Sequence, residues 1–353
     1  MKERIWLITG AAGHLGSVIA NMLAQRGEHV RGLVLPNDAN ARFLHTDIEQ
    51  IEGDVCVPRT LIPFFAYDPQ TQSPVLIHAA GIVSITSKRN DLLCRVNVEG
   101  TRNIVHMCKQ YQIPRMIYVS SVHAIPEKKR GEMIAESDVF DPELVRGEYA
   151  KSKAVATKYV LSQSSESFSV SVVHPSGIIG PGDRGNAHLT QLAIDYLNGR
   201  LYACVKGGYD FVDVRDVAEG IISCVDLGEN GEAYILSNQF YDIHSFLAVL
   251  QSVSHGKKIK TVLPMWLAKV TAPLSEWYYR LLKQPPLYTR YSLQTLESNG
   301  LFSHKKADEV LHYHPRPLET TLQDMTSFLK QTNRIQEKAS AKKRQKQKKL
   351  QYQ

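Results

Sequence analysis

The sequence lacks the features that mark a membrane span, a metal centre or a disulfide-linked fold. No apolar run reaches the roughly 18 residues that a membrane-spanning helix needs. The five cysteines show no C-x-x-C spacing and no histidine-rich neighbourhood, so we expect reduced thiols and no metal site. The first residues lead directly into a strand-like run without the layout of a signal peptide, which predicts a cytoplasmic protein.

The body of the chain also lacks a net charge. The formal charge of +7 coincides with residues 334–349, which contain eight lysines and arginines and a single acid, Glu337, while the remaining basic and acidic residues balance. A basic surface spread over the fold would favour nucleic acid, so we expect no specific nucleic-acid partner. The basic segment itself predicts a weak contact with an anionic surface, or only better solubility.

The sequence does contain an alternation of short apolar runs and helical stretches. This pattern predicts βαβ units, in which helices cover both faces of a parallel sheet. We therefore predict an α/β fold with a doubly wound, Rossmann-type parallel sheet and right-handed crossovers. Strands are expected at residues 5–8, 30–35, near 51, and at 75–78, 116–119 and 168–173.

Three glycines follow the first predicted strand and open the first predicted helix. In the motif TGAAGHLG (residues 9–16) their spacing is G-x-x-G-x-x-G. Gly10 permits the tight turn, Gly13 lets the backbone approach a pyrophosphate, and Gly16 lets the helix pack closely on the strand. The helix N-terminus then presents N–H groups to phosphate. In this strand–turn–helix context the motif predicts a dinucleotide site.

The end of the second strand has no acid, although a dinucleotide site usually carries one there for the ribose 2′-hydroxyl. Residues 33–37 read LVLPN. A carboxylate at this point would repel a 2′-phosphate, so its absence gives a slight preference for NADP over NAD. Arg31 and Arg42 are nearby candidates to hold that phosphate, and either could equally be a surface charge.

Two further strand ends offer contacts to the same cofactor. The segment GDV follows the third strand, where Asp54, with Val55 beside it, either reaches an adenine edge or is simply a turn aspartate. Ala79, Ala80 and Gly81 end the fourth strand with small residues. Small side chains suit a backbone that passes close to a ligand, and they also suit ordinary packing.

The most informative stretch is YAKSK at residues 149–153. If a helix begins here, Tyr149 and Lys153 lie at positions i and i+4 on one face. An adjacent ammonium favours the phenolate and lowers the phenol pKa from about 10 toward neutral pH, so the pair can transfer a proton. Ser120 and Ser121 close the fifth strand at the ligand-binding edge of the sheet, where a hydroxyl can hold a developing oxyanion.

Together these elements make the sequence resemble an extended short-chain dehydrogenase/reductase of the NAD-dependent epimerase/dehydratase family. The matching motifs follow the family order over most of residues 1–330. Besides TGAAGHLG and YAKSK, they are HAAG (78–81), VNVEGTRNI (96–104), YVSS (118–121), HPSGIIGPGD (174–183) and FVDVRDVAEG (211–220). The branch with dihydroflavonol reductases and 3β-hydroxysteroid dehydrogenases looks most similar. The sugar-nucleotide epimerase branch usually has the acid that this chain lacks.

The resemblance implies a role for each matching catalytic residue. Tyr149 is the proton donor and acceptor, and Lys153 lowers its pKa and binds the nicotinamide ribose. Ser121 orients the substrate oxygen, with Ser120 as its competitor. Asn97, in the motif VNVEGT, supports the site from the helix behind it.

The resemblance also implies further cofactor contacts, and the chain departs from the family pattern near some of them. Pro175 and Ser176 would lie beside the nicotinamide. His14 and Leu15 stand at the helix N-terminus, where the cofactor phosphates would bind, and His174 stands where many relatives carry arginine. These departures affect details of cofactor and substrate binding and leave the chemistry in place.

In this family the substrate pocket forms from segments after about residue 180. The resemblance therefore divides the chain into two regions and a tail. Residues 1–180 are the predicted dinucleotide-binding Rossmann domain. Residues 181–330 are a smaller, mostly substrate-binding region, interleaved with the sheet near 211–240, and residues 331–353 are a basic, disordered tail. Candidate pocket-wall residues, each also a good core residue, are Ile85, Tyr209, Phe211, Trp266 and Tyr288.

The aromatic stretch at residues 261–283 has two interpretations. A helix that covers the substrate pocket is favoured over an amphipathic helix that lies on a lipid surface.

The favoured function is reversible hydride transfer between a nicotinamide and a hydrophobic ketone, aldehyde or secondary alcohol. The alternative is a nucleotide-sugar epimerase or dehydratase that uses the same residues and returns the hydride to its substrate. A non-enzymatic dinucleotide-binding module would predict a broken Ser-Tyr-Lys set, and the set is intact. The expected partner is a small-molecule substrate, and the resemblance allows a homodimer, since relatives often dimerise through a two-helix interface.

Overall fold

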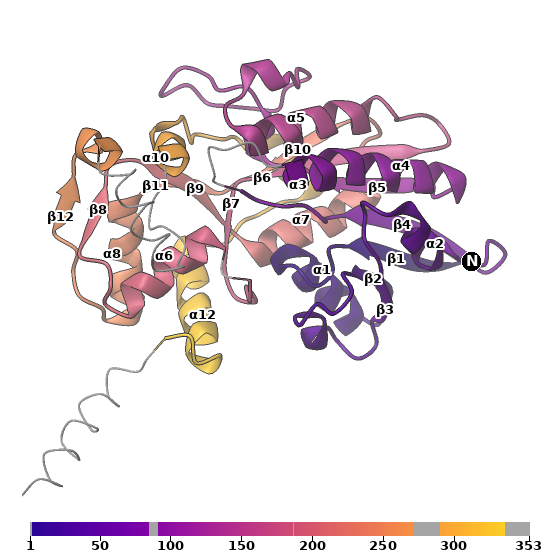
Figure 1. The fold of residues 1–353 in the computed structure, drawn as a ribbon, viewed down its shortest axis with the longest axis horizontal. Helices are drawn as coiled ribbons and strands as arrows, with labels where there is room; N and C mark the ends of the chain where they lie inside the picture. Colours follow the sequence, from indigo (N-terminus) through magenta and orange to yellow (C-terminus); the bar gives the residue numbers. More distant parts are fainter. Residues whose placement is uncertain (1, 85–90, 186, 271–289, 336–353) are drawn as a thin grey trace, which may run out of the picture.

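A seven-stranded parallel sheet forms the centre of the structure, a computed structural model that describes residues 2–84, 91–185, 187–270 and 290–335 (Figure 1). The strand order is β10-β6-β5-β4-β1-β2-β3. The order reverses direction beside β1, as in a doubly wound sheet, so the predicted Rossmann-type fold is confirmed. The strands are β1 (Glu3–Thr9), β2 (His29–Val34), β3 (Glu49–Glu52), β4 (Gln72–His78), β5 (Arg115–Val119), β6 (Ser169–Pro175) and β10 (Ala233–Leu236).

Helices cover both faces of this sheet because its buried strands present apolar side chains on both sides. In β1, Ile5 and Leu7 pack into the core on one face, and Trp6 and Ile8 pack into the core on the other. The first face is covered by α2 (Ile62–Phe65), α4 (Thr101–Gln110) and α5 (Glu148–Leu161), and the second by α1 (His14–Gln25), α7 (Val214–Leu227) and α11 (Lys305–Leu311). Figure 1 shows α4 and α5 on one side of the strands and α1 and α7 on the other.

A smaller region stands beside the sheet and is built around a third apolar core, with Phe211 and Phe246 stacked at 4.4 Å between ring centroids. Its strands are β7 (Gly177–Ile179), β9 (Gly208–Asp213) and β11 (Gln239–Asp242) in one sheet, and β8 (Ala203–Val205) and β12 (Thr261–Leu263) in another. Its helices are α6 (His188–Leu197), α8 (Ile243–Ser254), α10 (Arg290–Glu297) and α12 (Leu318–Gln331). Between these elements, α7 and β10 return to the main sheet.

The folded body extends beyond the boundary expected at residue 330. The Arg334 guanidinium donates to the Asp183 carbonyl, and Ile335 is buried in the third core. Residues 336–353, with most of the basic segment, lie outside the described residues. In the described part of the chain, no helix combines the length and apolarity needed to cross a bilayer.

Candidate active site

The glycine loop between β1 and α1 requires glycine at two positions for packing and offers the third to a ligand. Gly10 has a φ of 69°, and a Cβ there would lie 2.8 Å from the Ala80 backbone. A Cβ on Gly16 would lie 2.1 Å from the Gly10 carbonyl oxygen. A Cβ on Gly13 would meet only that oxygen, at 3.2 Å, within a 4 Å radius. The space beside Gly13 therefore fits the pyrophosphate of a dinucleotide.

The helix that follows the loop begins at His14, whose side chain reaches the chain beyond β7. His14 Nε2–H donates to the Pro181 carbonyl at 3.1 Å. Burial lowers the pKa of His14, with a smaller opposing effect from Asp183. Leu15 packs against the second core. Both residues therefore position α1 and the segment after β7 around the expected phosphate site.

Asp54 and Val55 lie at the carboxyl end of β3, as expected, and both have local partners. Asp54 Oδ1 accepts from the Cys56 backbone N–H at 2.8 Å, which is the bond of a turn aspartate. Val55 is buried against Gly100, where a Cβ would come within 2.7 Å of it. These contacts explain both residues as parts of the turn, and the adenine contact stays a prediction.

Arg31 is one of the two candidate arginines for the 2′-phosphate of NADP, and the structure shows that it is unsuited to that role. Its side chain is buried, Nε donates to Glu49 at 2.6 Å, and Nη1 donates to the Phe64 carbonyl at 3.1 Å. Arg42 lies instead over the Phe43 ring, with its guanidinium carbon 4.7 Å from the ring centroid.

Tyr149 and Lys153 lie one turn apart on α5 and are both buried. The Lys153 ammonium donates to the Val119 carbonyl at 2.8 Å and lies 3.5 Å from the Tyr118 hydroxyl. Burial lowers the pKa of Lys153 to about 7. A Cβ on Gly81 would lie 3.3 Å from Lys153 Nζ, so the small residue after β4 leaves room for this cation.

Asn97 fixes α5 to the chain that leaves β4. It lies in a π-helical turn, Arg95–Gly100, of the kind often found at functional sites. Asn97 Nδ2 donates to the Ile82 carbonyl at 3.0 Å and to Ser152 Oγ at 3.1 Å, and Oδ1 accepts from the Ile82 N–H at 2.8 Å. The Asn97 amide therefore holds the N-terminal part of α5, which carries Tyr149 and Lys153, against the segment that follows β4.

The two serines at the end of β5 have different surroundings. Ser120 Oγ lies 2.6 Å from Thr157 Oγ1 in a buried bond with α5. Ser121 begins the short helix η4 (Val122–Ala124), and its Oγ accepts from the His123 N–H at 3.3 Å. The Ser121 carbonyl accepts from His174 Nδ1–H at 2.9 Å. The geometry thus favours Ser121 as the hydroxyl that meets substrate.

His78 and His174 are fully buried near Lys153. Thr101 donates to the Asn97 carbonyl, so it accepts from His78 Nε2–H at 3.0 Å, and His78 Nδ1 accepts from Thr9 Oγ1 at 2.7 Å. Burial, reinforced by repulsion from Lys153, lowers the pKa of His78 to about 3. Burial likewise lowers the pKa of His174 to about 4. Both imidazoles are therefore neutral at physiological pH.

Pro175 and Ser176 stand at the end of β6, as expected for residues beside the nicotinamide. Ser176 Oγ donates to Asp210 Oδ1 at 2.5 Å, which ties the end of β6 to β9. The same oxygen accepts from the Asn238 N–H at 2.9 Å. Burial raises the pKa of Asp210 to about 6.

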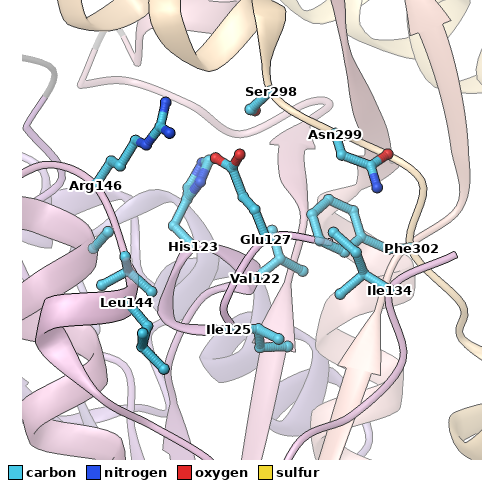
Figure 2. Close-up of a pocket in the computed structure, with 12 residues that line it drawn as sticks. Val122, His123, Ile125, Glu127, Ile134, Leu144, Arg146, Ser298, Asn299 and Phe302 are labelled. Atoms are coloured by element: carbon cyan, nitrogen blue, oxygen red, sulfur yellow. The ribbon is translucent and has the colours of Figure 1, made fainter. Parts of the chain in front are cut away.

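A cavity of about 170 Å³ opens beside the Tyr149 end of α5 (Figure 2). The His123 ring lines it and meets the Tyr149 ring edge-on at 6.2 Å between centroids. Apolar side chains form part of its wall, and Glu127, Arg146 and Asn299 add polar groups. The full lining is Val122, His123, Ile125, Glu127, Ile134, Leu144, Val145, Arg146, Ala150, Ser298, Asn299 and Phe302.

The residues expected to wall a pocket do not line this cavity. Phe211 is fully buried in the third core, Tyr209 packs edge-on against it, and Trp266 is 67% exposed. Ile85 and Tyr288 lie outside the described residues. Most of the lining residues lie in the segments between the serine and tyrosine motifs. Their position between two catalytic motifs is the feature of the sequence that could have predicted a substrate pocket here.

The fold and this site define a class of protein. A parallel sheet in this order, with a glycine loop that fits a pyrophosphate and a Ser-Tyr-Lys set at its carboxyl edge, is the arrangement of a nicotinamide-dependent short-chain dehydrogenase/reductase. Residues 6–237 match the NAD dependent epimerase/dehydratase family, and the chain belongs to that family as an enzyme of the extended type. The resemblance stated from the sequence is confirmed.

Individual relatives agree with this assignment. The chain is 26% identical over 333 residues to sterol demethylase protein B of Methylococcus capsulatus, covering 93% of this chain and 99% of that protein. It is 28% identical to the decarboxylating sterol-4-alpha-carboxylate 3-dehydrogenase of Schizosaccharomyces pombe, covering 88% and 92%. The crystal structure of gox2253 superposes with a TM-score of 0.80 at 28% identity, covering 95% and 100%.

Two glycine variants separate packing from cofactor binding. Gly16→Ala should lower the free energy of unfolding by roughly 1–3 kcal/mol, because its Cβ overlaps the Gly10 carbonyl. Gly13→Ala should melt near the wild-type temperature yet weaken dinucleotide binding by at least about tenfold, since its Cβ enters the cofactor space. Thermal melting and dinucleotide titration measure the two effects. Unchanged cofactor affinity in a folded Gly13→Ala protein would contradict the proposed phosphate site.

The buried imidazole of His174 predicts a pH dependence of stability. Its folded pKa of about 4 lies below the unfolded value near 6.5, so between these values only the unfolded chain binds the proton. Its contribution to the free energy of unfolding therefore falls by about 2 kcal/mol as the pH drops from 7 to 5. Urea unfolding at both pH values should show a loss in His174→Gln that is smaller by this amount. His106→Gln, at an exposed position on α4, is the control, and equal losses in all three proteins would refute the prediction.

Proposed function

We propose that the protein is a dehydrogenase or reductase that interconverts a hydrophobic secondary alcohol and its ketone at Ser121, Tyr149 and Lys153. The observation that carries this proposal is the position of the cavity, which begins at η4 directly after Ser121 and ends at Ala150 directly after Tyr149. A substrate held in this cavity would therefore lie next to the two residues that carry these hydroxyls.

The cavity wall combines apolar side chains with hydrogen-bonding groups. Ile125, Ile134, Leu144, Val145 and Phe302 contribute aliphatic and aromatic surface. A volume of about 170 Å³ accommodates one ring of a polycyclic substrate, and the remainder would extend out of the cavity. His123, Glu127, Arg146, Ser298 and Asn299 supply hydrogen-bonding groups, so the choice of an alicyclic alcohol over a nucleotide sugar rests on the sterol-related names of two relatives.

The chain's own groups supply the proton chemistry and the orientation. Ser121 Oγ would donate to the substrate oxygen and hold it where negative charge develops. Tyr149 would take the alcohol proton during oxidation and return it during reduction. The Lys153 ammonium, on the same face of α5, favours the Tyr149 phenolate, and a pKa of about 7 lets Lys153 exchange its own proton near neutral pH. When bound, the nicotinamide accepts or supplies the hydride.

A sterol-like alcohol is the substrate class to which the relatives point, and the cavity has the volume for one of its rings. Two relatives that align over most of this chain carry names that refer to sterols, and one is named as a 3-dehydrogenase. We therefore propose a ring hydroxyl on a fused alicyclic skeleton as the reacting group. The partly polar cavity, with Arg146 and Asn299, leaves room for a polar substituent beside that hydroxyl.

Single substitutions at the site test the proposal. With a 3-hydroxysterol and oxidised cofactor, Tyr149→Phe should lower kcat by at least about 100-fold, because proton transfer is lost. Ser121→Ala should lower kcat by about 10²–10³-fold, whereas Ser120→Ala, which loses a bond to Thr157, should retain most activity. Reduced nicotinamide absorbance measures turnover, and dinucleotide titration confirms that each variant still binds cofactor.

The same assays also distinguish a dehydrogenase from a nucleotide-sugar epimerase. Net cofactor reduction by sterol alcohols supports a dehydrogenase. Turnover of a UDP-sugar without net change in the cofactor, together with inertness toward sterols, would favour the epimerase. Activity retained in Tyr149→Phe would overturn the assigned site under either chemistry.

We further propose that NADP binds more tightly than NAD. The end of β2 carries no carboxylate, and two arginines flank Phe43 nearby: Arg42 at 4.7 Å and Arg184 at 3.5 Å from the ring centroid. Burial, followed by repulsion from Arg42 and Arg334, lowers the pKa of Arg184. This crowding of like charges would be relieved by a bound phosphate.

Substitution of Arg42 tests the cofactor preference. Arg42→Gln should weaken NADP binding by about tenfold through loss of one charge-assisted contact, and NAD binding should not change. Arg59→Gln, an exposed arginine on the turn after β3, is the matched control. Equal effects on both cofactors, or tighter binding of NAD by the wild type, would contradict the preference.

A further inference from the structure

One end of the molecule carries exposed apolar side chains beside a group of lysines, which we call the β8–β12 face. The strand pair β8–β12 lies at the end of the molecule opposite the N-terminus in Figure 1. The apolar members of the face are Tyr202, Val262, Trp266 and Val270, and its basic members are Lys206, Lys257, Lys258 and Lys260.

Three of the four apolar members are largely exposed. Tyr202 is 81% exposed, Trp266 67% and Val270 66%. Residues 265–270 are helical, so Trp266 and Val270 lie one turn apart on the same side, while Ala268 between them is buried in the body. Exposed apolar side chains gathered in this way mark an interaction site more often than scattered ones do.

The strand pair has apolar and basic members of the face at each of its two ends. In the parallel register Ala203 pairs with Thr261, so Tyr202 and Lys260, each one residue earlier, reach the same end of the ribbon. Lys206 follows the other end of β8. Residues 255–270 contain no acid, and neither do residues 200–206. The described part of the chain shows no ion pair for any of the four lysines of the face, whereas the nearby Lys269 pairs with Glu297.

We infer that the β8–β12 face binds the surface of an anionic lipid bilayer. Tyrosine and tryptophan prefer the boundary between headgroups and acyl chains, and lysines beside them gain energy from anionic headgroups. A second copy of the chain fits this face less well, because a two-fold contact would set lysine against lysine. The surface is distinct from the basic segment at residues 334–349 and does not depend on the proposed reaction.

Vesicle co-sedimentation of the full chain tests the inference. The protein should bind vesicles of phosphatidylcholine with phosphatidylglycerol and bind much less to phosphatidylcholine alone. Trp266→Ser with Val270→Ser, and separately Lys257→Gln with Lys258→Gln and Lys260→Gln, should each lower the partition coefficient by at least about tenfold. Unchanged melting temperature and dinucleotide affinity establish that these variants are folded.

Two matched controls carry the same changes elsewhere. Val139→Ser with Leu227→Ser removes exposed apolar groups from the segment before α5 and from the end of α7, and it should bind vesicles like the wild type. Lys346→Gln with Lys348→Gln and Lys349→Gln removes three charges from the C-terminal segment and should lower binding less than the β8–β12 lysine variant.

Three results would overturn the inference. They are equal binding by wild type and both face variants, loss of binding confined to the C-terminal lysine variant, and a self-association of the wild type that the Trp266 and Val270 substitutions abolish without any change in vesicle binding.

Discussion

The hydrogen bond from the buried Lys153 ammonium to the Val119 carbonyl is the interaction on which the rest of the site depends. A cation taken out of water loses hydration energy that one carbonyl only partly restores. The lowered pKa of about 7 expresses the remaining cost. The fold meets this cost by ending β5 beside α5, so that the last carbonyl of the strand points to the lysine. Tyr149 lies one turn earlier on the same helix, so the bond that fixes α5 to β5 also fixes the backbone that carries this tyrosine.

The two histidines near Lys153 are neutral, because the same buried surroundings disfavour any further positive charge. His78 is held between Thr9 and Thr101 as a neutral tautomer, and repulsion from Lys153 adds to its burial in lowering its pKa. His174 shares this behaviour. A carboxylate in their place would raise the lysine pKa and fix its proton. Neutral imidazoles and hydroxyls instead satisfy the buried backbone and leave the lysine able to release a proton near neutral pH.

The fold and the local motifs could be predicted from the sequence because each depends on neighbouring residues. Periodicity located six strands of the main sheet, and the glycine spacing located the loop that Gly10 and Gly16 close. The return of the chain to the sheet near residues 211–240, where β10 lies, was expected from the family resemblance. The bonding of Arg31 to Glu49 joins two different strands, and no local pattern indicates it. Most of the cavity wall lies between the serine and tyrosine motifs, but Ser298, Asn299 and Phe302 complete it from a distant part of the chain, and that closure could not be predicted.

The balanced charge of the body illustrates a related limit. A net charge is a sum, and the body includes partly buried pairs such as Arg215 with Asp324 at 2.7 Å and Arg316 with Asp216 at 2.7 Å. These pairs hold α7 against the C-terminal segments and present little field to solvent. Lysines without such partners, on the β8–β12 face, act on the surroundings even though the total is neutral. The contacts that a protein makes through its charges therefore follow from which charges remain unpaired at one place on its surface, and only the folded arrangement determines that.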